Sequence, residues 1–467
     1  MTSLSRRDMI KLVGAFGAAA VSRTTSRAAE QEQAFRPVRL KITEVEVHEI
    51  VAPYQDYNAR WLVRHRRLGF QGRTVYVIRT DKGLEGYGET GSAPAPNRDQ
   101  FQYLIGRNPF LEFNRVTHLG MSMAMYDLLG KYLDIPLWRL IGPQVRQWIP
   151  LSAWTMPQPP DAMAREVVSL SKRGYSWLKF HVDFFQNVVD QTEAMQRVAP
   201  PGFRLQYDFN GDQSLHTVLP ILKELEKFPI AGRVEDPIPS GRPVDVDQWR
   251  SLRESTRLPI LSHAPGTDYL IEKAADGCLI SRFPIPEAVR AAHVAEAANS
   301  PFMLQHVGGN ITLAFLAHEA SVFKMATLAH IHCSHLWKDD VTEETLPVVG
   351  GSVKVPEGAG LGVTLDREKL RKLAAPQKPK LDRFIVRMKY HNGLTVYLRF
   401  VDDPYQAGQR YLAGDEGTVA IKELPNRIPG SGPIYRRPVV TDFWDETGTA
   451  DFERIWKRTE AGPYWEP

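Results

Sequence analysis

The sequence predicts an α/β protein whose central part is built from parallel strands and crossover helices, with an α+β domain before it and a β-rich extension after it. The central prediction rests on short apolar segments that alternate with segments of helical periodicity from residue 150 onward. The flanking predictions rest on strands of alternating polarity that are joined by turn signals. Strands and helices that alternate in this way form either a barrel or an open doubly wound sheet.

Length and charge limit these assignments. The 467 residues are enough for two or three domains, and a content of 43% hydrophobic and 24% charged residues is typical of a globular protein. The net charge of +4 comes from 58 basic and 54 acidic residues, without a long run of one sign. The charge pattern therefore predicts no nucleic-acid partner.

Residues 1–29 have the layout of an export signal. Arg6 and Arg7 precede a short apolar segment, residues 12–21, and small and polar residues follow it. Paired arginines are typical of a twin-arginine leader and predict a periplasmic or extracellular protein; a basic N-terminus without fixed structure is the alternative. No segment has the roughly 20 apolar residues that a membrane-spanning helix needs, so no stable membrane insertion is expected.

Residues 38–150 are predicted to form the α+β domain. The predicted strands and helix are residues 40–51, 74–78, 85–89 and 121–133. Gly83, Gly86 and Gly88 could be mistaken for a dinucleotide-binding loop. No helix follows them directly, so we discount that interpretation.

Residues 151–375 are predicted to hold the repeating strands and helices. The predicted strands are residues 176–182, 203–209, 231–235, 258–262, 277–282 and 301–305. The predicted helices between them include residues 161–173, 215–227 and 287–298. Polar and ionisable residues collect at the C-terminal ends of the strands, and in a barrel those ends form the functional face.

Residues 376–467 are predicted to form the β-rich extension, because a Pro/Lys segment at residues 376–380 interrupts the pattern. Asn392 and Gly393 lie between two strands of alternating polarity, which is a strong hairpin signal. The aromatic residues of the tail, up to Trp465, could stack on a sugar or dock the extension against the barrel.

Side chains that could carry chemistry follow the predicted strands in chain order. They are Lys179, His181, Asp208, Asn210, Glu235, His263, Arg282 and His306. Residues two apart share one face of a strand, so Lys179 lies beside His181 and Asp208 beside Asn210. If the strands are parallel neighbours these groups converge, and Asp208 and Glu235 could bind Mg²⁺ through their carboxylate oxygens.

Three further segments occur in a fixed order around these strand ends: Asp81 to Glu89, Met123 to Gly142 and Pro356 to Leu370. Together with the strand-end residues they resemble the mandelate racemase and muconate lactonizing branch of the enolase superfamily, over residues 40–372. The resemblance implies a modified (β/α) TIM-type barrel with an N-terminal α+β capping domain. It also implies a homo-oligomer.

The resemblance further implies a reaction, the abstraction of a proton α to a carboxylate, with Mg²⁺ holding the resulting enediolate. It implies that Asp208 and Glu235 bind the metal, that Lys179 and His181 occupy the base motif, and that His306 is the opposing base. Such a proton is too weakly acidic for a side-chain base to remove unaided, so stabilisation of the developing charge must supply much of the rate.

The sequence departs from the family pattern at three places. His181 stands where the family has a lysine, although a neutral histidine can also act as a base. The third carboxylate ligand is replaced by either His263 or Ala264, and an imidazole ligand would favour Mn²⁺ or Zn²⁺ over Mg²⁺. The carboxylate that should orient the opposing histidine would lie near Ser281, so His306 is expected to lack its acidic partner.

Structural roles remain open for the same residues. Asp208 and Glu235 could pair with basic groups at the barrel rim, and Lys179 could belong only to a buried ion pair. His181 and His306 could be core histidines with satisfied hydrogen bonds.

A second histidine cluster, His330, His332, Cys333 and His335, resembles a metal site. On a strand, His330 and His332 share one face and Cys333 takes the other. We expect the cluster to end the eighth strand, with His332 or His335 facing the mouth. His332, Asn210 and Arg282 are then candidates for binding substrate, while Cys278 and Cys333 are expected to be buried free thiols.

Three functions follow from these observations. The first is an exported lyase or isomerase, of dehydratase, racemase or epimerase type, that acts on a small-molecule hydroxy acid or acid sugar. The second is a catalytically degenerate barrel that binds a carbohydrate or organic acid without turnover. The third is a zinc hydrolase that uses His263 and the histidines near His332.

A predicted lid, residues 51–73, lies between the first two strands of the capping domain. Its basic residues are Arg60, Arg64, His65, Arg66 and Arg67. A basic lid would attract an anionic substrate, and a solvated basic loop is the alternative.

Overall fold

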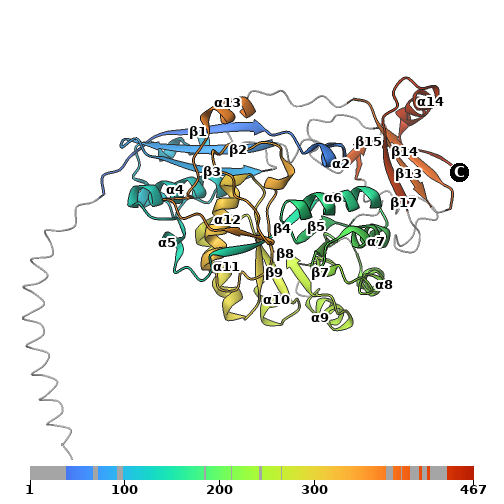
Figure 1. Ribbon diagram of the computed structural model, residues 1–467, viewed down its shortest axis with the longest axis horizontal. Coiled ribbons are helices and arrows are strands. Elements are labelled where there is room, and N and C mark those ends of the chain that lie inside the picture. The colour runs from blue at the N-terminus through green and yellow to red at the C-terminus, as the bar shows by residue number, and fades with distance from the viewer. Residues whose placement is uncertain are drawn as a thin grey trace, which may run out of the picture.

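The structure is a computed structural model, and it describes residues 38–66, 72–91, 98–182, 186–211, 213–240, 245–263, 266–374, 382–390, 392–399, 410–412, 418–420 and 439–467. Figure 1 shows a capping domain at the upper left, a barrel in the centre and a C-terminal module at the right. The predicted export signal lies outside the described residues, so export stays a prediction.

The capping domain is a three-stranded antiparallel sheet covered by one long helix. The sheet has the order β1 (Ile42–Val51), β2 (Gly72–Thr80) and β3 (Glu85–Gly91), and α4 (Leu119–Leu133) packs on it. A Cβ atom on Gly88 would lie 1.7 Å from the carbonyl oxygen of Gly120, and one on Gly86 would lie 2.1 Å from that of Ala124. The glycines of β3 therefore allow close approach of α4 and do not form a phosphate-binding loop.

Shorter helices complete the capping domain. They are α2 (Asp56–Arg66), η1 (Arg98–Leu104), α3 (Pro109–Glu112) and α5 (Trp138–Ile141). Helix α2 lies inside the predicted lid.

The central part is a closed barrel of eight parallel strands. The strands are β4 (Trp148–Thr155), β5 (Trp177–His181), β6 (Arg204–Asp208), β7 (Ala231–Glu235), β8 (Ile260–His263), β9 (Gly277–Ser281), β10 (Phe302–Gln305) and β11 (His330–Ile331). Each strand pairs with its neighbour in this order, and β11 pairs with β4 to close the barrel. The prediction of a (β/α) barrel is confirmed.

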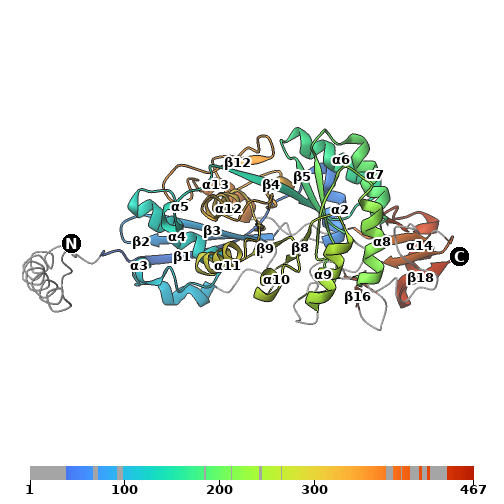
Figure 2. The same ribbon diagram turned by 90° about the horizontal axis from the view of Figure 1, so that it is seen from below.

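Helices surround the barrel (Figure 2). They are α6 (Pro160–Lys172), α7 (Val188–Val198), α8 (Leu215–Leu225), α9 (Val246–Ser255), α10 (Thr267–Ile271), α11 (Ile285–Ala297) and α12 (Asn310–Val322). After β11 the short helix η3 (Ser334–Leu336), the strand β12 (Ser352–Lys354), which pairs antiparallel with β4, and α13 (Arg367–Ala374) form the closing segment.

The alternation of side chains along the strands separates an outer core from the barrel interior. Leu178, Phe180, Leu205 and Tyr207 are buried in the apolar cluster shared with the surrounding helices. The residues between them therefore point into the barrel, because successive side chains of a strand point to opposite faces. This alternation sends Lys179 and His181 toward the barrel axis.

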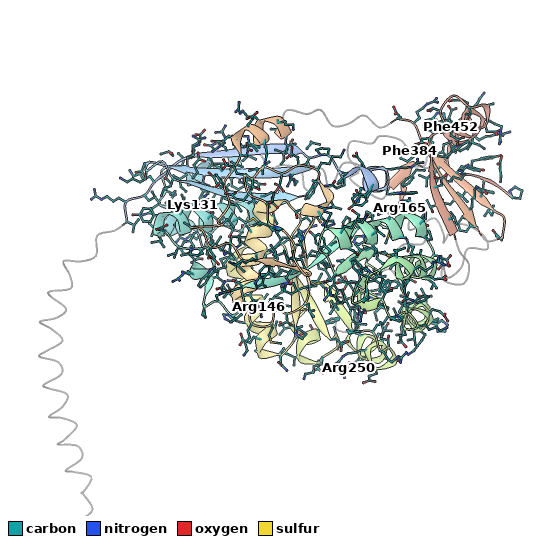
Figure 3. The ribbon with its side chains drawn as sticks, viewed as in Figure 1. Lys131, Arg146, Arg165, Arg250, Phe384 and Phe452 are labelled. Atoms are coloured by element: carbon teal, nitrogen blue, oxygen red, sulfur yellow. The ribbon has the colours of Figure 1, made fainter. Side chains whose placement is uncertain are left out.

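The C-terminal module is an antiparallel sheet with one helix. The sheet has the order β17 (Val439–Trp444), β13 (Ile385–Tyr390), β14 (Thr395–Arg399) and β18 (Tyr464–Glu466), and its helix is α14 (Ala450–Arg458), followed by η6 (Thr459–Ala461). β13 and β14 form the predicted antiparallel hairpin, and β15 (Arg410–Leu412) pairs with β16 (Thr418–Ala420). Phe384 and Phe452 lie in this module (Figure 3).

The structure also bears on the cysteines and on membrane-spanning helices. Cys278 and Cys333 are buried free thiols, as expected. In the described part of the chain, no helix combines the length and the apolar character required to cross a membrane.

Candidate active site

Three neighbouring strands bring the central residues of the site together. His181 at the end of β5 pairs in register with Asp208 of β6, and Asp208 pairs with Glu235 of β7. All three lie at the carboxyl ends of parallel strands, which is the face where barrels carry their functional residues. The predicted convergence of Lys179, His181, Asp208 and Glu235 is present in the structure.

Lys179 forms the floor of this site. Its Nζ atom lies 2.6 Å from Glu235 Oε1 and 3.0 Å from Asp208 Oδ2, and it donates to Gln305 Oε1 at 2.8 Å. Three acceptors match the three protons of an ammonium group, so Lys179 has no proton-accepting lone pair to offer. Lys179 therefore acts as a buried cation that holds the two carboxylates.

The protonation of these groups follows from their contacts. Burial opposes the charged form of Lys179, but the charges of Asp208 and Glu235 raise the pKa of Lys179 above its ordinary value. Burial also opposes the charged form of Asp208, but Lys179 and His181 lower the pKa of Asp208 to about 2. The buried Lys179–Asp208 ion pair is charged at neutral pH.

His181 lies above Lys179 at the mouth of the barrel. Its Nε2 atom is 3.3 Å from Asp208 Oδ2, and its ring meets the ring of Trp154 edge to face at 5.3 Å. The histidine is partly exposed, with 12% of its side chain accessible. Of the two residues in the predicted base motif, His181 is the one that can accept a proton.

A third carboxylate and a second histidine lie beside Glu235. Among the described residues, Glu235, Asp236 and His263 form a group of possible metal ligands whose ligand atoms all lie within 4.8 Å of one another. His263 Nδ1 is 3.2 Å from Glu235 Oε1, and the His263 backbone N–H donates to Asp236 Oδ1 at 2.8 Å. Burial and the neighbouring charges of Glu235 and Asp208 raise the pKa of Asp236 to about 7.

These donors fit a divalent cation. Octahedral ligands of Mg²⁺ lie about 2.0–2.1 Å from the ion, which places neighbouring ligand atoms about 3 Å apart. Glu235, Asp236 and His263 offer ligand atoms within 4.8 Å of one another, which is close enough for them to bind one cation together. Each carboxylate oxygen has two lone pairs, so the contacts of Lys179 with Asp208 and Glu235 leave them able to bind a cation as well.

The role of His306 as the opposing base stays a prediction. His306 follows β10, and its Nε2 atom lies 2.8 Å from Glu319 Oε2 of α12. Gln305, one residue earlier, points inward to Lys179. The expected lack of an acidic partner is wrong, because Glu319 supplies one; both side chains are at most 1% exposed.

His332 does not face the mouth of the barrel, in contrast to the prediction. It is fully buried, and its Nε2 lies 3.1 Å from the Tyr175 hydroxyl while its Nδ1 lies 2.8 Å from the Ser334 hydroxyl. His335 contacts the backbone of Trp154. Burial lowers the pKa of His332 to about 3. The histidine cluster ends the eighth strand, as predicted. It does not lie beside His263 or face the mouth of the barrel, so these histidines do not form the ligand set that the zinc hydrolase hypothesis requires.

Asn210 and Arg282, the other predicted substrate-binding residues, are exposed and follow β6 and β9. Both have a left-handed backbone, with φ of 54° and 61°. The Asn210 backbone N–H donates to Asp208 Oδ1 at 2.9 Å and thereby fixes that carboxylate. Left-handed backbone is uncommon outside glycine and clusters at functional sites.

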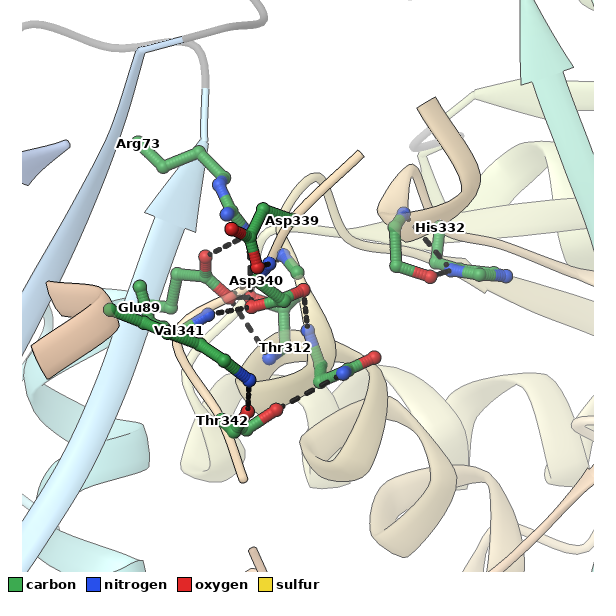
Figure 4. A network of polar contacts seen from close by, with 12 residues as sticks. Arg73, Glu89, Thr312, His332, Asp339, Asp340, Val341 and Thr342 are labelled. Carbon is green, nitrogen blue, oxygen red and sulfur yellow. Dashed lines mark hydrogen bonds and ion pairs between the residues drawn. The ribbon is translucent and has the colours of Figure 1, made fainter. Parts of the chain in front are cut away.

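The capping domain is locked to the barrel near the carboxyl end of β10 (Figure 4). Arg73 of β2, which is 1% exposed, donates from Nη1 to Glu89 Oε1 at 2.8 Å, and its guanidinium stacks on Trp337 at 4.4 Å. Glu89 Oε2 accepts hydrogen bonds from the Gly309 backbone N–H and the Thr312 hydroxyl at the start of α12. A helix N-terminus favours such a negative charge.

Helix α2 joins all three parts of the molecule. The Tyr57 hydroxyl and Asn58 Nδ2 donate to Glu166 of α6, at 3.2 Å and 3.4 Å. On the side of the C-terminal module, Arg60 donates to the Phe443 carbonyl oxygen, and the ring of Trp61 lies 5.0 Å from that of Phe443. Of the predicted basic lid, Arg60 thus serves docking; the side chains of residues 64–67 lie outside the described part.

Three residues of the site escaped sequence reasoning. Gln206 donates from Nε2 to Glu235 Oε2 at 2.5 Å, and Gln305 accepts from Lys179. Both are uncharged, and only their place on an inward strand face could have indicated them. Asp236 directly follows Glu235, and strand alternation predicts that it points away from Glu235.

The chain is similar to known proteins in sequence and in fold. Residues 162–369 match the enolase C-terminal domain-like family. A D-xylonate dehydratase of Haloferax volcanii is 23% identical over 383 residues, covering 70% of this chain and 88% of that protein. An N-succinyl-L-Arg/Lys racemase of Bacillus cereus is 22% identical over 375 residues, covering 72% of this chain and 99% of that protein.

Among solved structures, an enolase from Pseudomonas fluorescens with bound magnesium, potassium and tartrate has a TM-score of 0.61 and 20% identity over 72% of this chain and 93% of that one. Together these matches confirm the fold, which is the one seen in solved enolase-superfamily structures. The sequence relatives are dehydratases and racemases, so the prediction of an enzyme, of lyase or isomerase type, is confirmed at this low identity.

Proposed function

We propose that this protein belongs to the enolase superfamily and is an exported, divalent-metal-dependent lyase or isomerase that removes the proton α to a carboxylate of a hydroxy acid or acid sugar. One observation carries the proposal: a histidine and two carboxylates, His181, Asp208 and Glu235, lie side by side at the carboxyl ends of three neighbouring barrel strands. The relatives named D-xylonate dehydratase and D-galactonate dehydratase support the class of substrate.

The chain's own residues divide the work. Asp208 and Glu235 would hold the cation, together with His263. A divalent cation bound there supplies positive charge that stabilises an enediolate. His181 takes the α-proton on its imidazole, and Asp208, 3.3 Å away, orients the ring and stabilises the imidazolium that forms. Lys179 keeps the two carboxylates in place from below.

The exchange of the α-proton with solvent tests this proposal. The purified protein is incubated with Mg²⁺ or Mn²⁺ and a panel of sugar acids in D₂O, and deuterium at the α-carbon is followed by NMR. Since general base catalysis contributes roughly 10²- to 10⁴-fold, His181→Asn should slow exchange by at least 100-fold. His293→Asn, which changes an exposed histidine of α11, should leave the rate unchanged.

A second function is favoured by one specific observation, the Lys179 ammonium bonded to both carboxylates while His306 is buried and paired with Glu319. A barrel that had lost turnover but still bound a carboxylated ligand would fit these contacts. If the wild-type protein binds sugar acids but exchanges no α-proton with either metal, the proposed enzyme is wrong and the binding protein replaces it.

A further inference from the structure

We propose that Asp236 is the third carboxylate of the metal site, and that Asp208, Glu235, Asp236 and His263 together select Mn²⁺ or a similar transition-metal ion over Mg²⁺. The inference deepens the proposed function and rests on it for the presence of a metal. It accounts for the third carboxylate ligand that the sequence lacks at the family's usual position, because the strand after Glu235 carries no carboxylate and ends in His263.

The backbone explains how two consecutive residues reach one site. In a regular strand the side chains of Glu235 and Asp236 would point to opposite faces. Asp236 instead has a left-handed backbone with φ of 42°. Its N–H donates to the Leu261 carbonyl oxygen at 3.0 Å, and its own carbonyl oxygen accepts from the Gly211 N–H at 2.8 Å. Both neighbouring strands thus hold the turn that brings the two carboxylates within 4.8 Å of the same imidazole.

Asp236 adds a third carboxylate to this region. Lys179 contacts Asp208 and Glu235 directly, whereas Asp236 lies beside Glu235 and His263. Arg233 of β7 is engaged elsewhere, because it donates to Gln206 Oε1 at 2.6 Å and to the Ala329 carbonyl oxygen at 2.8 Å. The Asp236 carboxylate accepts a hydrogen bond from the His263 backbone N–H at Oδ1, and its remaining lone pairs can bind a cation.

The nitrogen ligand sets the class of metal. Imidazole nitrogen suits transition metals, whereas Mg²⁺ prefers oxygen ligands and gives up its water reluctantly. His263 Nδ1 lies 3.2 Å from Glu235 Oε1, and its backbone N–H is tied to Asp236 Oδ1, so the imidazole is held on the side of the two carboxylates. A site with one nitrogen and three carboxylates therefore favours Mn²⁺ over Mg²⁺.

Titration of the metal-free protein with Mn²⁺ and with Mg²⁺, followed by calorimetry, tests the ligand set without any substrate. Loss of even a supporting group at a metal site typically costs 10- to 100-fold in affinity, so Asp236→Asn should weaken Mn²⁺ binding at least tenfold. His263→Gln should lower the ratio of Mn²⁺ to Mg²⁺ affinity. Asp247→Asn, which changes an exposed aspartate of α9, is the matched control and should bind like the wild type.

Pulsed electron paramagnetic resonance on the wild-type protein with Mn²⁺ keeps the test independent of how the variants fold. A nitrogen coupling that disappears in His263→Gln is expected. Wild-type affinity in Asp236→Asn, or the absence of a nitrogen coupling, would overturn the inference and leave the proposed function standing. Mn²⁺ binding with the predicted ligands but without α-proton exchange would overturn the proposed function alone, and no Mn²⁺ binding would overturn the inference.

Discussion

At the scale of single residues, the site is governed by which face of a strand each side chain takes. Lys179, His181, Asp208 and Glu235 could be predicted because they end apolar strands with a clear alternation. The contact of Gln305 with Lys179 could not, since a shift of one residue decides whether Gln305 or His306 points inward, and the sequence does not set that register. Asp236 depends on a left-handed backbone that no local residue pattern announces.

A buried carboxyl outside the active site gives a pH prediction at this scale. Burial raises the pKa of Glu166 from 4.5 to about 7 in the folded protein. The folded state then binds more protons than the unfolded state between pH 4.5 and 7, so stability falls as pH rises through this window. One pKa unit corresponds to about 1.4 kcal/mol, so ionisation of Glu166 should lower the free energy of unfolding of the wild type by up to about 3 kcal/mol at high pH. Glu166→Gln cannot ionise and should not show this decrease.

Urea unfolding at pH 5 and pH 8 measures this difference. The Glu166→Gln variant should gain stability over the wild type at pH 8 and little at pH 5. Glu193→Gln, which changes an exposed carboxyl of α7, serves as the control. Equal pH dependence in wild type and Glu166→Gln would show that Glu166 does not titrate in this range.

At the scale of elements, the strand and helix order was predictable throughout the barrel because each segment carries its own periodicity. The contacts between elements were not. Arg73 and Glu89 are far from Gly309 in the chain, and nothing in their own segments indicates that β2, β3 and α12 meet at one buried ion pair. Long-range pairing of charges leaves no local pattern.

At Gly309, the contact between the capping domain and the start of α12 leaves no space for a side chain. A Cβ atom there would lie 1.9 Å from Arg73 Nη1 and 2.4 Å from Asp340 Oδ2. Gly309→Ala should therefore separate the guanidinium from its carboxylates, and breaking a buried pair costs about 3–5 kcal/mol. Chemical denaturation should show this loss, and hydrogen exchange should rise in β2 and β3. Unchanged stability would mean that the joint can shift to accept a methyl group.

At the scale of the whole molecule, the C-terminal module is held to the rest largely through α2. Arg60 lies 3.8 Å from Asp442 and 3.6 Å from Asp445, and Gln186, which precedes α7, donates to the Thr441 carbonyl oxygen at 3.2 Å. The β-rich character of the module was predictable from its hairpin signal. Its docking site was not, because the sequence placed the tail against the barrel and the predicted lid against solvent or substrate.

Replacing Arg60 with alanine should loosen the module without unfolding it. The variant loses the hydrogen bond to the Phe443 carbonyl oxygen and both ion pairs, so amide exchange in β17 should become faster. Arg165→Ala is the matched control, since Arg165 on α6 is exposed and pairs with Asp161 one turn away on the same helix. Equal exchange in both variants would show that Phe443 and Trp61 hold the module by apolar contact alone.

The contact between Arg60 and Phe443 joins two segments that are synthesised at very different times. The two residues are 383 positions apart in the chain. At a translation rate of about 5–20 residues per second, α2 leaves the ribosome roughly 20–80 s before its partner strand exists. During that interval the barrel strands can pair while the ring of Trp61 still lacks its contact with Phe443, so α2 presents an uncovered surface that a chaperone could bind.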